Sequence, residues 1–230
     1  MNRVFVVGDI HGAHKALLQC FERSNFDYEN DTLISLGDLC DGWPETKEVI
    51  DELLKIKNLI FIYGNHDLWF KNWLLKGEVP ALWVSLQGGK STINSYKNKI
   101  NEDHITFINK GLFYFEYKNK IFVHGGIDLN VPINKQDSEF LVWDRTLIQI
   151  AYNSYLNKKE KISSYDEIYV GHTPTLKWGV NVPLKFCEVI LMDTGAGWPG
   201  GRLTIMNVET KEKFYSDIVD TLYPGIHGRL

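Results

Sequence analysis

Residues 4–12 read VFVVGDIHG, a short apolar run that passes at once into glycine, aspartate and histidine. An apolar run of this length that is rich in β-branched residues is typical of a strand buried on both faces. The same unit recurs along the chain, with an apolar run before each of the polar segments GDLCDG at 37–42, GNHD at 64–67, HGG at 124–126, GHTP at 171–174 and DTG at 193–195. The repetition predicts a sheet whose strands each end in a polar loop.

The intervening segments favour helices. Residues 13–23 and 45–55 place apolar side chains on one face of a helix. Alternation of strands and helices indicates an α/β fold with right-handed crossovers. We therefore expect a mixed α/β sheet rather than an all-helical or all-strand protein.

The second half of the chain is less regular. After residue 180 we expect strands in quick succession at 187–192, 202–208 and about 212–216, which form an antiparallel second sheet or a sheet edge. Residues 67–110 and 135–160 are expected to be helical insertions that wall a cleft. The chain is long enough for one sizeable core, so residues 1–230 are predicted to form a single domain.

Composition excludes several classes of protein. With 44% hydrophobic and 23% charged residues the chain is close to an average soluble globular protein, and a net charge of −4 gives no electrostatic reason to expect nucleic-acid or membrane binding. No segment approaches the ~18–20 consecutive apolar residues that a membrane span needs. The three cysteines show no CxxC spacing, which disfavours a disulfide framework or a zinc ribbon and favours the cytoplasm.

The polar loops carry metal-ligand residue types. In open α/β sheets ligands bind beyond the carboxyl ends of the strands, so these loops should meet. Carboxylates mixed with imidazoles suit Mn, Fe or Zn. The candidate ligands are Asp9, His11, Asp38, Asn65, His124 and His172. In an extended segment Asp9 and His11 would point the same way, whereas the neighbours Asn65 and His66 should point apart and do different work.

The alternative for these aspartates and histidines is a purely structural role. A lone Asp-Gly is usually a turn, and a lone buried histidine is usually a hydrogen-bonded core residue. Five strand ends with the same ligand types make that explanation unattractive for the group. We expect His14, His104 and His227 to have structural roles only.

In their order and spacing, the polar segments resemble the motifs of the phosphoprotein phosphatase superfamily of metallophosphoesterases. These segments are GDIHG, GDLCDG, GNHD, HGG and GHTP. WDR at 143–145, VGHTP at 170–174 and MDTGA at 192–196 are most similar to its bacteriophage-type serine/threonine protein phosphatases, and GNHDL at 64–68 also resembles the bis(5′-nucleosyl)-tetraphosphatases. The resemblance implies a calcineurin-like metallophosphoesterase fold, in which two mixed β-sheets are flanked by helices as a four-layer αββα sandwich.

The resemblance also implies roles for residues. Two divalent metal ions are implied, with Mn²⁺ expected and Fe or Zn possible. One metal would take Asp9, His11 and Asp38, and the other would take the bridging Asp38 with Asn65, His124 and His172. A hydroxide shared by the metals would attack phosphorus while His66, oriented by Asp41, acts as general acid. Arg145 and Asn65 would bind the substrate phosphate, and Asp193 would have a supporting or structural role.

Two positions depart from the superfamily pattern. Gly42 and Tyr63 stand where arginines usually clamp phosphate, which leaves Arg145 as the one matched arginine, unless it forms a salt bridge on the helix that contains Asp144. A lost charge-assisted contact typically costs roughly 1.5–3 kcal/mol. The departures therefore bear on the substrate and not on the metal site.

Two further features have competing interpretations. Residues 89–92 read GKST, the end of a Walker A loop, but Val84 occupies the place of its first glycine and no clear strand precedes it, so we expect a loop of the cleft wall with Lys90 exposed or holding phosphate. Tryptophans could stack a nucleobase or simply pack, and packing is the favoured interpretation for Trp69, Trp73, Trp83, Trp143, Trp178 and Trp198.

The favoured function is metal-dependent hydrolysis of phosphate monoesters, with phosphoserine or phosphothreonine proteins as the preferred substrate class and small phosphoesters also possible. The first alternative is a phosphodiesterase or a bis(5′-nucleosyl)-tetraphosphatase-like hydrolase. The second is a non-catalytic binding module. The protein is expected to be a cytoplasmic monomer with no nucleic-acid or membrane partner.

Overall fold

The computed structural model describes residues 2–97 and 99–229, so three residues of the expected domain 1–230, Met1, Asn98 and Leu230, lie outside the described residues. The strands are β1 (Val4–Val7), β2 (Thr32–Ser35), β3 (Asn58–Phe61), β4 (Tyr114–Tyr117), β5 (Lys120–Val123), β6 (Glu167–Val170), β7 (Leu184–Phe186), β8 (Val189–Leu191), β9 (Thr204–Asn207) and β10 (Lys213–Tyr215). The α-helices are α1 (His14–Ser24), α2 (Thr46–Leu53), α3 (Asn65–Lys76), α4 (Ala81–Leu86), α5 (Gly89–Ser95), α6 (Glu102–Ile108), α7 (Ser138–Trp143), α8 (Thr146–Leu156) and α9 (Val219–Leu222). Two 3₁₀ turns are η1 (Ile133–Lys135) and η2 (Thr175–Trp178).

The strands form two five-stranded mixed sheets. In the first, with the order β10-β9-β1-β2-β3, strands β1 to β3 are parallel and β9 is antiparallel to β1. In the second, with the order β4-β5-β6-β8-β7, strands β5, β6 and β8 are parallel and both edge strands are antiparallel. The parallel centre of each sheet aligns the carboxyl ends of its strands on one edge.

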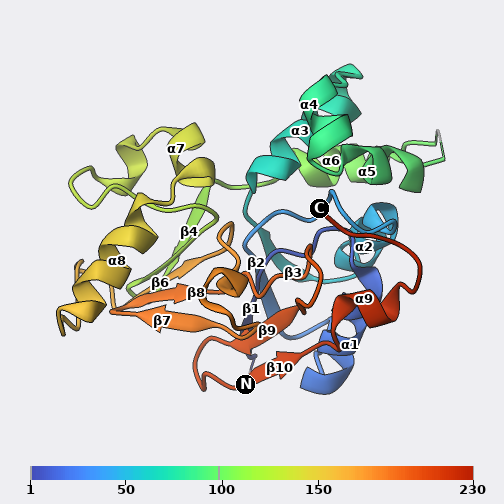
Figure 1. Ribbon diagram of the computed structural model, residues 1–230. Coiled ribbons are helices and arrows are strands. Elements are labelled where there is room, and N and C mark those ends of the chain that lie inside the picture. The colour runs from blue at the N-terminus through green and yellow to red at the C-terminus, as the bar shows by residue number, and fades with distance from the viewer. Residues whose placement is uncertain (1, 98, 230) are drawn as a thin grey trace.

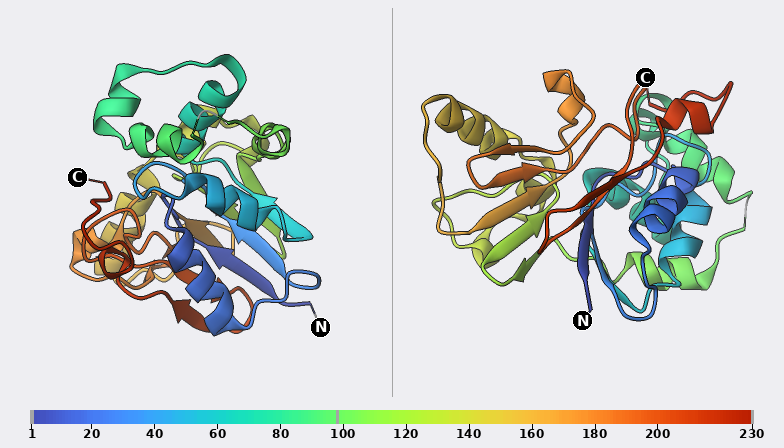
Figure 2. Two further views of the ribbon diagram at one scale, coloured as in Figure 1. Left: turned by 90° about the vertical axis from the view of Figure 1, so that its right-hand side faces the viewer. Right: turned by 90° about the horizontal axis from the view of Figure 1, so that it is seen from below.

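Alternate side chains of each strand divide the core into three layers. Val6 of β1 packs with Phe122 of β5 between the sheets, whereas Phe5 and Val7 face α1 and α2. On the outer face of the second sheet, Ile121 packs against residues of α7 and α8. Figure 2 shows the two sheets lying face to face between the helices. The predicted calcineurin-like fold, two mixed sheets flanked by helices, is confirmed.

Several local predictions need correction. The strand expected at 187–192 is observed as the shorter β8, Val189–Leu191, because Cys187 adopts a left-handed φ of +52° in the turn between β7 and β8. Of the two alternatives for the strands after residue 180, the separate antiparallel sheet is wrong and the sheet edge is confirmed, because β9 and β10 form an antiparallel edge of the first sheet and β7 forms one of the second. The edge strand β4 was not predicted. The helices expected at 13–23 and 45–55 are observed as α1 and α2.

The loops at the carboxyl ends of the strands meet between two helical groups. Figure 1 shows α3 to α6 rising above the first sheet and α7 and α8 beside the second, with the red segment after α9 returning toward the space between them. No helix among residues 2–97 and 99–229 is long and apolar enough to cross a membrane.

Candidate metal centre

The structure brings the six candidate metal ligands together. Asp9 and His11 follow β1, Asp38 follows β2, Asn65 opens α3, His124 follows β5 and His172 follows β6, and all six are buried. Their ligand atoms form two groups, Asp9 with His11 and Asp38, and Asp38 with His124 and His172, in each of which the atoms lie within 4.8 Å of one another. Asp38 belongs to both groups, as a residue that bridges two ions would.

Three of the candidate ligands have unusual backbone conformations, which orient their side chains. His11, Asp38 and His172 have φ values of +51°, +50° and +64°, in the left-handed region that side chains other than glycine rarely adopt. His11 is therefore not in the extended segment expected from the sequence, although its Nε2 still lies 4.0 Å from Asp9 Oδ2. Backbone strain of this kind costs on the order of 1–3 kcal/mol per residue and concentrates at functional sites.

Glycines let the loops approach closely. A Cβ atom at Gly64 would lie 2.1 Å from Asp38 Oδ1, and one at Gly171 would lie 2.3 Å from Asp9 Oδ1. The carboxylates could not keep their places beside any larger residue. The glycines of GNHD and GHTP are thus required by the geometry of the centre.

Backbone carbonyls orient the imidazoles. His11 Nδ1 lies 2.9 Å from the carbonyl oxygen of Cys40, and His124 Nδ1 lies 2.7 Å from that of Leu36. With each Nδ1–H donating to a carbonyl, Nε2 is the ring nitrogen that faces the carboxylates and is left to bind a metal ion. Histidine ligands of metals are usually held in this way.

The donor set fits divalent cations. His124 Nε2 lies 3.1 Å from Asn65 Oδ1 and 3.4 Å from Asp38 Oδ1, so three atoms that can each offer a lone pair converge. Among the described side chains, His172 Nε2 is buried without a hydrogen-bond partner. Burial also lowers the pKa of His11 to about 3 and of His172 to about 2, which keeps both imidazoles neutral and free to ligate.

The buried carboxylates of the centre carry negative charge that a bound cation would balance. Burial, together with Asp193 and Asp38, raises the pKa of Asp9, and burial raises the pKa of Asp193 to about 6. Asp193 Oδ1 accepts a hydrogen bond from Gly195 N at 2.9 Å, and Asp193 belongs to neither ligand group. Bound metal ions would stabilise the ionised carboxylates.

His66 lies at the edge of the centre and outside both ligand groups. Its Nε2 is 4.0 Å from Asp38 Oδ2, and its Nδ1 is 2.7 Å from Asp41 Oδ2. Asp41 is fully buried and also accepts hydrogen bonds from Trp83 Nε1 and Thr92 Oγ1, each at 2.6 Å. The imidazole is therefore fixed by Asp41 at Nδ1, while Nε2 faces Asp38 without a hydrogen bond.

The sequence analysis missed three residues that support the centre. Trp83 and Thr92 hold Asp41, and Asp67 accepts hydrogen bonds from the backbone N–H groups of Asp38, Leu39 and Gly64 at 2.7–2.9 Å. Asp67 was part of a quoted motif, but nothing local revealed the contact. The expectation of a loop at the GKST segment is wrong, because residues 89–92 form the start of α5. The segment supports the centre, since Thr92 Oγ1 accepts from Asp41 N at 2.9 Å and Ser91 Oγ accepts from Gly42 N at 3.1 Å.

The substrate side of the centre carries Arg145 and two tryptophans. Arg145 is exposed and has no recorded ion pair among the described residues; Asp144 instead accepts from the N–H groups of Thr146 and Leu147 at the start of α8. Partial burial of Arg145 lowers its pKa, and the negative charges of Asp38 and Asp9 oppose that shift. Trp143 is 42% exposed and meets His172 edge to face, with Trp69 beside it.

The remaining candidates are accounted for elsewhere. His14 lies on α1 with Nε2 3.6 Å from Glu52, His104 is buried between Tyr96 and Asp51, and His227 is exposed. Trp73 and Trp178 pack against other aromatic rings, and Lys90 is exposed. Cys20, Cys40 and Cys187 are free thiols.

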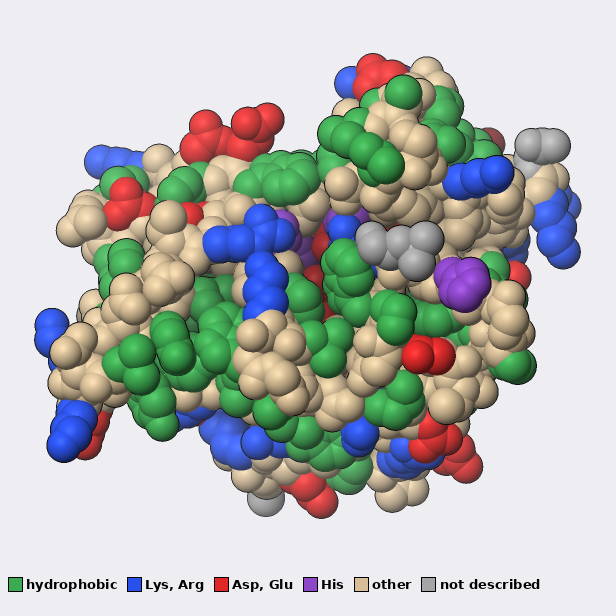
Figure 3. Space-filling view, in the orientation of Figure 1, with side chains coloured by type: hydrophobic (Ala, Val, Ile, Leu, Met, Phe, Trp, Pro, Cys, Tyr) green, Lys and Arg blue, Asp and Glu red, His purple; other side chains and the backbone are tan. Residues whose placement is uncertain are grey.

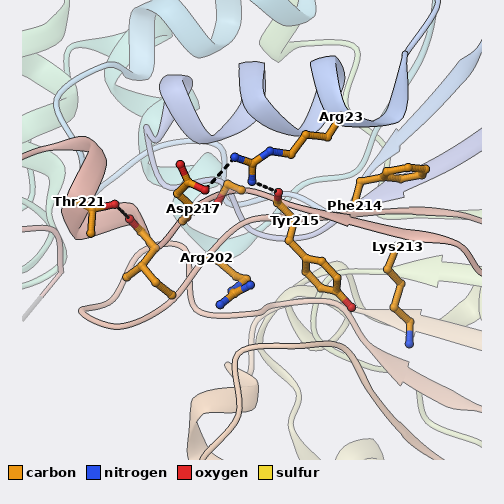
Figure 4. Close-up of a pocket in the computed structure, with 9 residues that line it drawn as sticks. Arg23, Arg202, Lys213, Phe214, Tyr215, Asp217 and Thr221 are labelled. Atoms are coloured by element: carbon orange, nitrogen blue, oxygen red, sulfur yellow. Dashed lines mark hydrogen bonds and ion pairs between the residues drawn. The ribbon is translucent and has the colours of Figure 1, made fainter.

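One contact at the centre was not expected. Arg229, from the segment after α9, places Nη1 3.2 Å from His11 Nε2, and its guanidinium lies 4.9 Å from the ring centre of Trp198. Figure 3 shows acidic and histidine side chains at the bottom of a hollow with basic side chains around it. A separate open hollow of about 600 Å³ lies between α1 and β10, where Arg23 pairs with Asp217 (Figure 4), and it contains none of the candidate ligands.

Comparisons with known proteins agree with this geometry. The family model for calcineurin-like phosphoesterases matches residues 2–211. Serine/threonine-protein phosphatase 1 of Salmonella typhimurium is 26% identical over 215 residues, covering 90% of this chain and 93% of the relative. The symmetrical bis(5′-nucleosyl)-tetraphosphatase of Pseudomonas putida strain F1 is 23% identical, covering 94% and 93%.

Solved structures show the same fold. A crystal structure described as that of a candidate diadenosine tetraphosphatase has a TM-score of 0.68 at 18% identity, covering 93% of this chain and 92% of that one. A protein serine/threonine phosphatase from Saccharomyces cerevisiae has a TM-score of 0.59 at 13% identity, covering 99% and 82%. With its two sheets, its strand-end ligand loops and a family match over residues 2–211, the chain belongs to the calcineurin-like phosphoesterase family.

Proposed function

We propose that the chain hydrolyses phosphate monoesters and that phosphoserine or phosphothreonine proteins are its preferred substrates. The observation that carries the proposal is the pair of ligand groups sharing Asp38, with His66 and Asp41 held beside them but outside them. The full-length similarity to a serine/threonine-protein phosphatase supports the substrate class.

The ligand assignment follows the two groups. Asp9, His11 and Asp38 would hold one divalent ion, and Asp38, Asn65, His124 and His172 would hold the other, with Mn²⁺ the expected metal. Bound metals would polarise the phosphoryl group and lower the pKa of a water molecule that attacks it.

The protein's own residues complete the reaction. His66 donates a proton to the leaving oxygen from Nε2, while Nδ1–H stays hydrogen-bonded to Asp41, whose carboxylate stabilises the imidazolium. Asp41 keeps its place because Trp83 and Thr92 also donate to it. Arg145 and Asn65 bind and orient the phosphate, and the Arg145 side chain is exposed and forms no ion pair among the described residues.

A second candidate function is hydrolysis of nucleoside polyphosphates. The exposed face of Trp143, next to His172 and Trp69, could stack a nucleobase while the phosphates reach the centre. Relatives named bis(5′-nucleosyl)-tetraphosphatase support it.

Turnover of four substrates by the Mn²⁺-loaded protein tests these proposals. The substrates are a phosphoserine peptide, p-nitrophenyl phosphate, bis(p-nitrophenyl) phosphate and diadenosine tetraphosphate. We expect the two monoesters to give the highest kcat/KM. Preference for the tetraphosphate would establish the second candidate, preference for the aryl diester would indicate a phosphodiesterase, and no turnover with both metals bound would indicate a binding module. Location in the cytoplasm and a monomeric state stay predictions.

A further inference from the structure

The segment after α9, residues 223–229, packs against the loops of the metal centre. The ring of Tyr223 stacks on Trp43 with 4.9 Å between ring centres, and Trp43 Nε1 donates to the carbonyl oxygen of Ala196 at 2.7 Å. A Cβ atom at Gly228 would lie 2.8 Å from the Trp43 indole, so this backbone passes directly over the ring. Arg229 N then donates to the carbonyl oxygen of Gly197 at 2.8 Å. These contacts fix the backbone of Arg229 beside the loops of the metal centre.

The guanidinium of Arg229 is held on two sides. Its Nη2 donates to Gln87 Oε1 at 3.0 Å, and its plane lies over Trp198 at 4.9 Å from the ring centre. The remaining Nη1 points into the centre and lies 3.2 Å from His11 Nε2. Gln87 and Trp198 thus serve as supports, and Nη1 is the donor presented to the ligand groups.

Arg229 fills the space beside Gly42. A Cβ atom at Gly42 would lie 3.4 Å from Arg229 Cγ and 3.1 Å from the carbonyl oxygen of His11. Gly42 also has a φ of +140°, which side chains with a Cβ rarely adopt. A side chain at position 42 would therefore be strained in this backbone, and the aliphatic part of the Arg229 side chain lies beside Gly42 instead.

The lone pair of His11 Nε2 can accept a hydrogen bond from Arg229 Nη1 or bind a metal ion, but it cannot do both at once. His11 is grouped with Asp9 and Asp38, a donor set that suits a divalent ion. With that ion bound, Nη1 becomes a donor in need of an acceptor at the edge of the centre. A phosphate oxygen is such an acceptor, and its negative charge suits the cationic guanidinium of Arg229.

We propose that Arg229 is a substrate-binding residue that donates a charge-assisted hydrogen bond to the phosphoryl group, together with Arg145. The inference rests on the proposed phosphoesterase function. It assigns to the segment after α9 a part in forming the substrate site. The other role open to Arg229 is that of a competitor that only keeps metal away from His11, and the test separates the two.

The test uses the full chain as Arg229→Ala and Arg229→Lys, with Arg23→Ala as the matched control. Arg23 pairs with Asp217 in the hollow of Figure 4 and touches none of the candidate ligands. Bound Mn²⁺ per chain is measured by elemental analysis, and the Kd for inorganic phosphate is measured by calorimetry on the Mn²⁺-loaded proteins. KM and kcat for p-nitrophenyl phosphate complete the set.

We expect Arg229→Ala to keep the Mn²⁺ content of the wild type and to raise the Kd for phosphate on the order of ten- to a hundredfold. KM should rise by a similar factor. The Kd and KM of Arg229→Lys should lie between those of the wild type and Arg229→Ala, because lysine keeps the positive charge but lacks the planar guanidinium. The Kd and KM of Arg23→Ala should match those of the wild type.

Unchanged phosphate binding in Arg229→Ala would overturn the inference. So would tighter Mn²⁺ binding with unchanged phosphate affinity, which would make Arg229 a metal competitor only. Reduced Mn²⁺ content in both Arg229 variants would make the residue a support of the metal site and would also overturn it. If the loaded wild type neither binds phosphate nor turns over a substrate, the proposed function fails as well. If the wild type does both and Arg229→Ala equals it, this inference alone fails.

Discussion

Replacement of His66 by asparagine separates proton transfer from metal binding. His66 belongs to neither ligand group, and its Nε2 stands 4.0 Å from the nearer carboxylate oxygen of Asp38. His66→Asn should therefore retain both metals and most of the affinity for substrate. What it removes is the proton donor for the leaving group.

The size of the loss follows from the surroundings of the imidazole. General acid catalysis typically contributes about 10²–10⁴-fold, or about 2.7–5.5 kcal/mol of transition-state stabilisation at ~1.36 kcal/mol per factor of ten. His66 is buried and bonded at 2.7 Å to Asp41, whose carboxylate is itself fixed by Trp83 and Thr92. A donor held this firmly should act near the middle of the range, so we expect kcat for phosphoserine to fall about 10³-fold.

The assay compares leaving groups. The alkoxide of phosphoserine needs a proton, whereas p-nitrophenolate hardly does, so kcat for p-nitrophenyl phosphate should fall much less. Asp41→Asn should give a weaker form of the same pattern because Asp41 only orients and charges the imidazole. Mn²⁺ content measured on the same preparations is the control.

Two results would refute this reasoning. Equal losses on both substrates would show that His66 stabilises charge in the transition state rather than donating a proton. Loss of one metal ion from His66→Asn would show that His66 is a ligand, contrary to its place outside both groups.

Two further predictions concern groups around the centre and on the second sheet. Thr92→Val removes the hydroxyl that accepts a hydrogen bond from Asp41 N and donates one to the Asp41 carboxylate. We expect kcat to fall several-fold and the free energy of unfolding, measured by thermal unfolding, to fall by about 1–3 kcal/mol. Unchanged kcat and stability would mean that Asp41 does not need this hydroxyl. Glu167 is buried, which would raise its pKa, but hydrogen bonds from Lys211, Tyr169 and Lys120 hold that pKa below 4.5 in the folded protein. The stabilisation is therefore complete above about pH 4.5 and is lost as the pH falls through the lowered pKa. Glu167→Gln should lower Tm at pH 7 by an amount corresponding to at most about 1 kcal/mol. Its difference from the wild type should shrink as the pH falls below 4.5, and a difference that grows toward acid would contradict the sign.

The sequence predicted the fold and the ligand loops because both are encoded locally. Buried parallel strands read as short apolar runs, and each strand end carries its own ligand, so Asp9, Asp38 and His124 could be identified one loop at a time. The edge strand β4 was missed because its residues Tyr114–Tyr117 are only partly buried and carry no such run. The turn at Cys187 was missed because nothing in its sequence signals a left-handed φ.

Residues that support the centre from a distance could not be predicted in this way. Thr92 is 51 positions from Asp41, and Arg229 is 218 positions from His11. Such contacts depend on how the α3–α6 group and the segment after α9 pack against the loops. The sequence located the missing cation at Gly42, but only the fold shows that Arg229 occupies the space beside it.

The central claim is that two divalent ions share Asp38. Elemental analysis of the protein loaded with Mn²⁺ and freed of excess metal tests it most directly, with Asp38→Asn as the comparison. The account predicts two ions per chain in the wild type and fewer than two in Asp38→Asn, because a neutral amide cannot neutralise two cations. A wild type that holds at most one ion, or an Asp38→Asn variant that still holds two tightly, would contradict it.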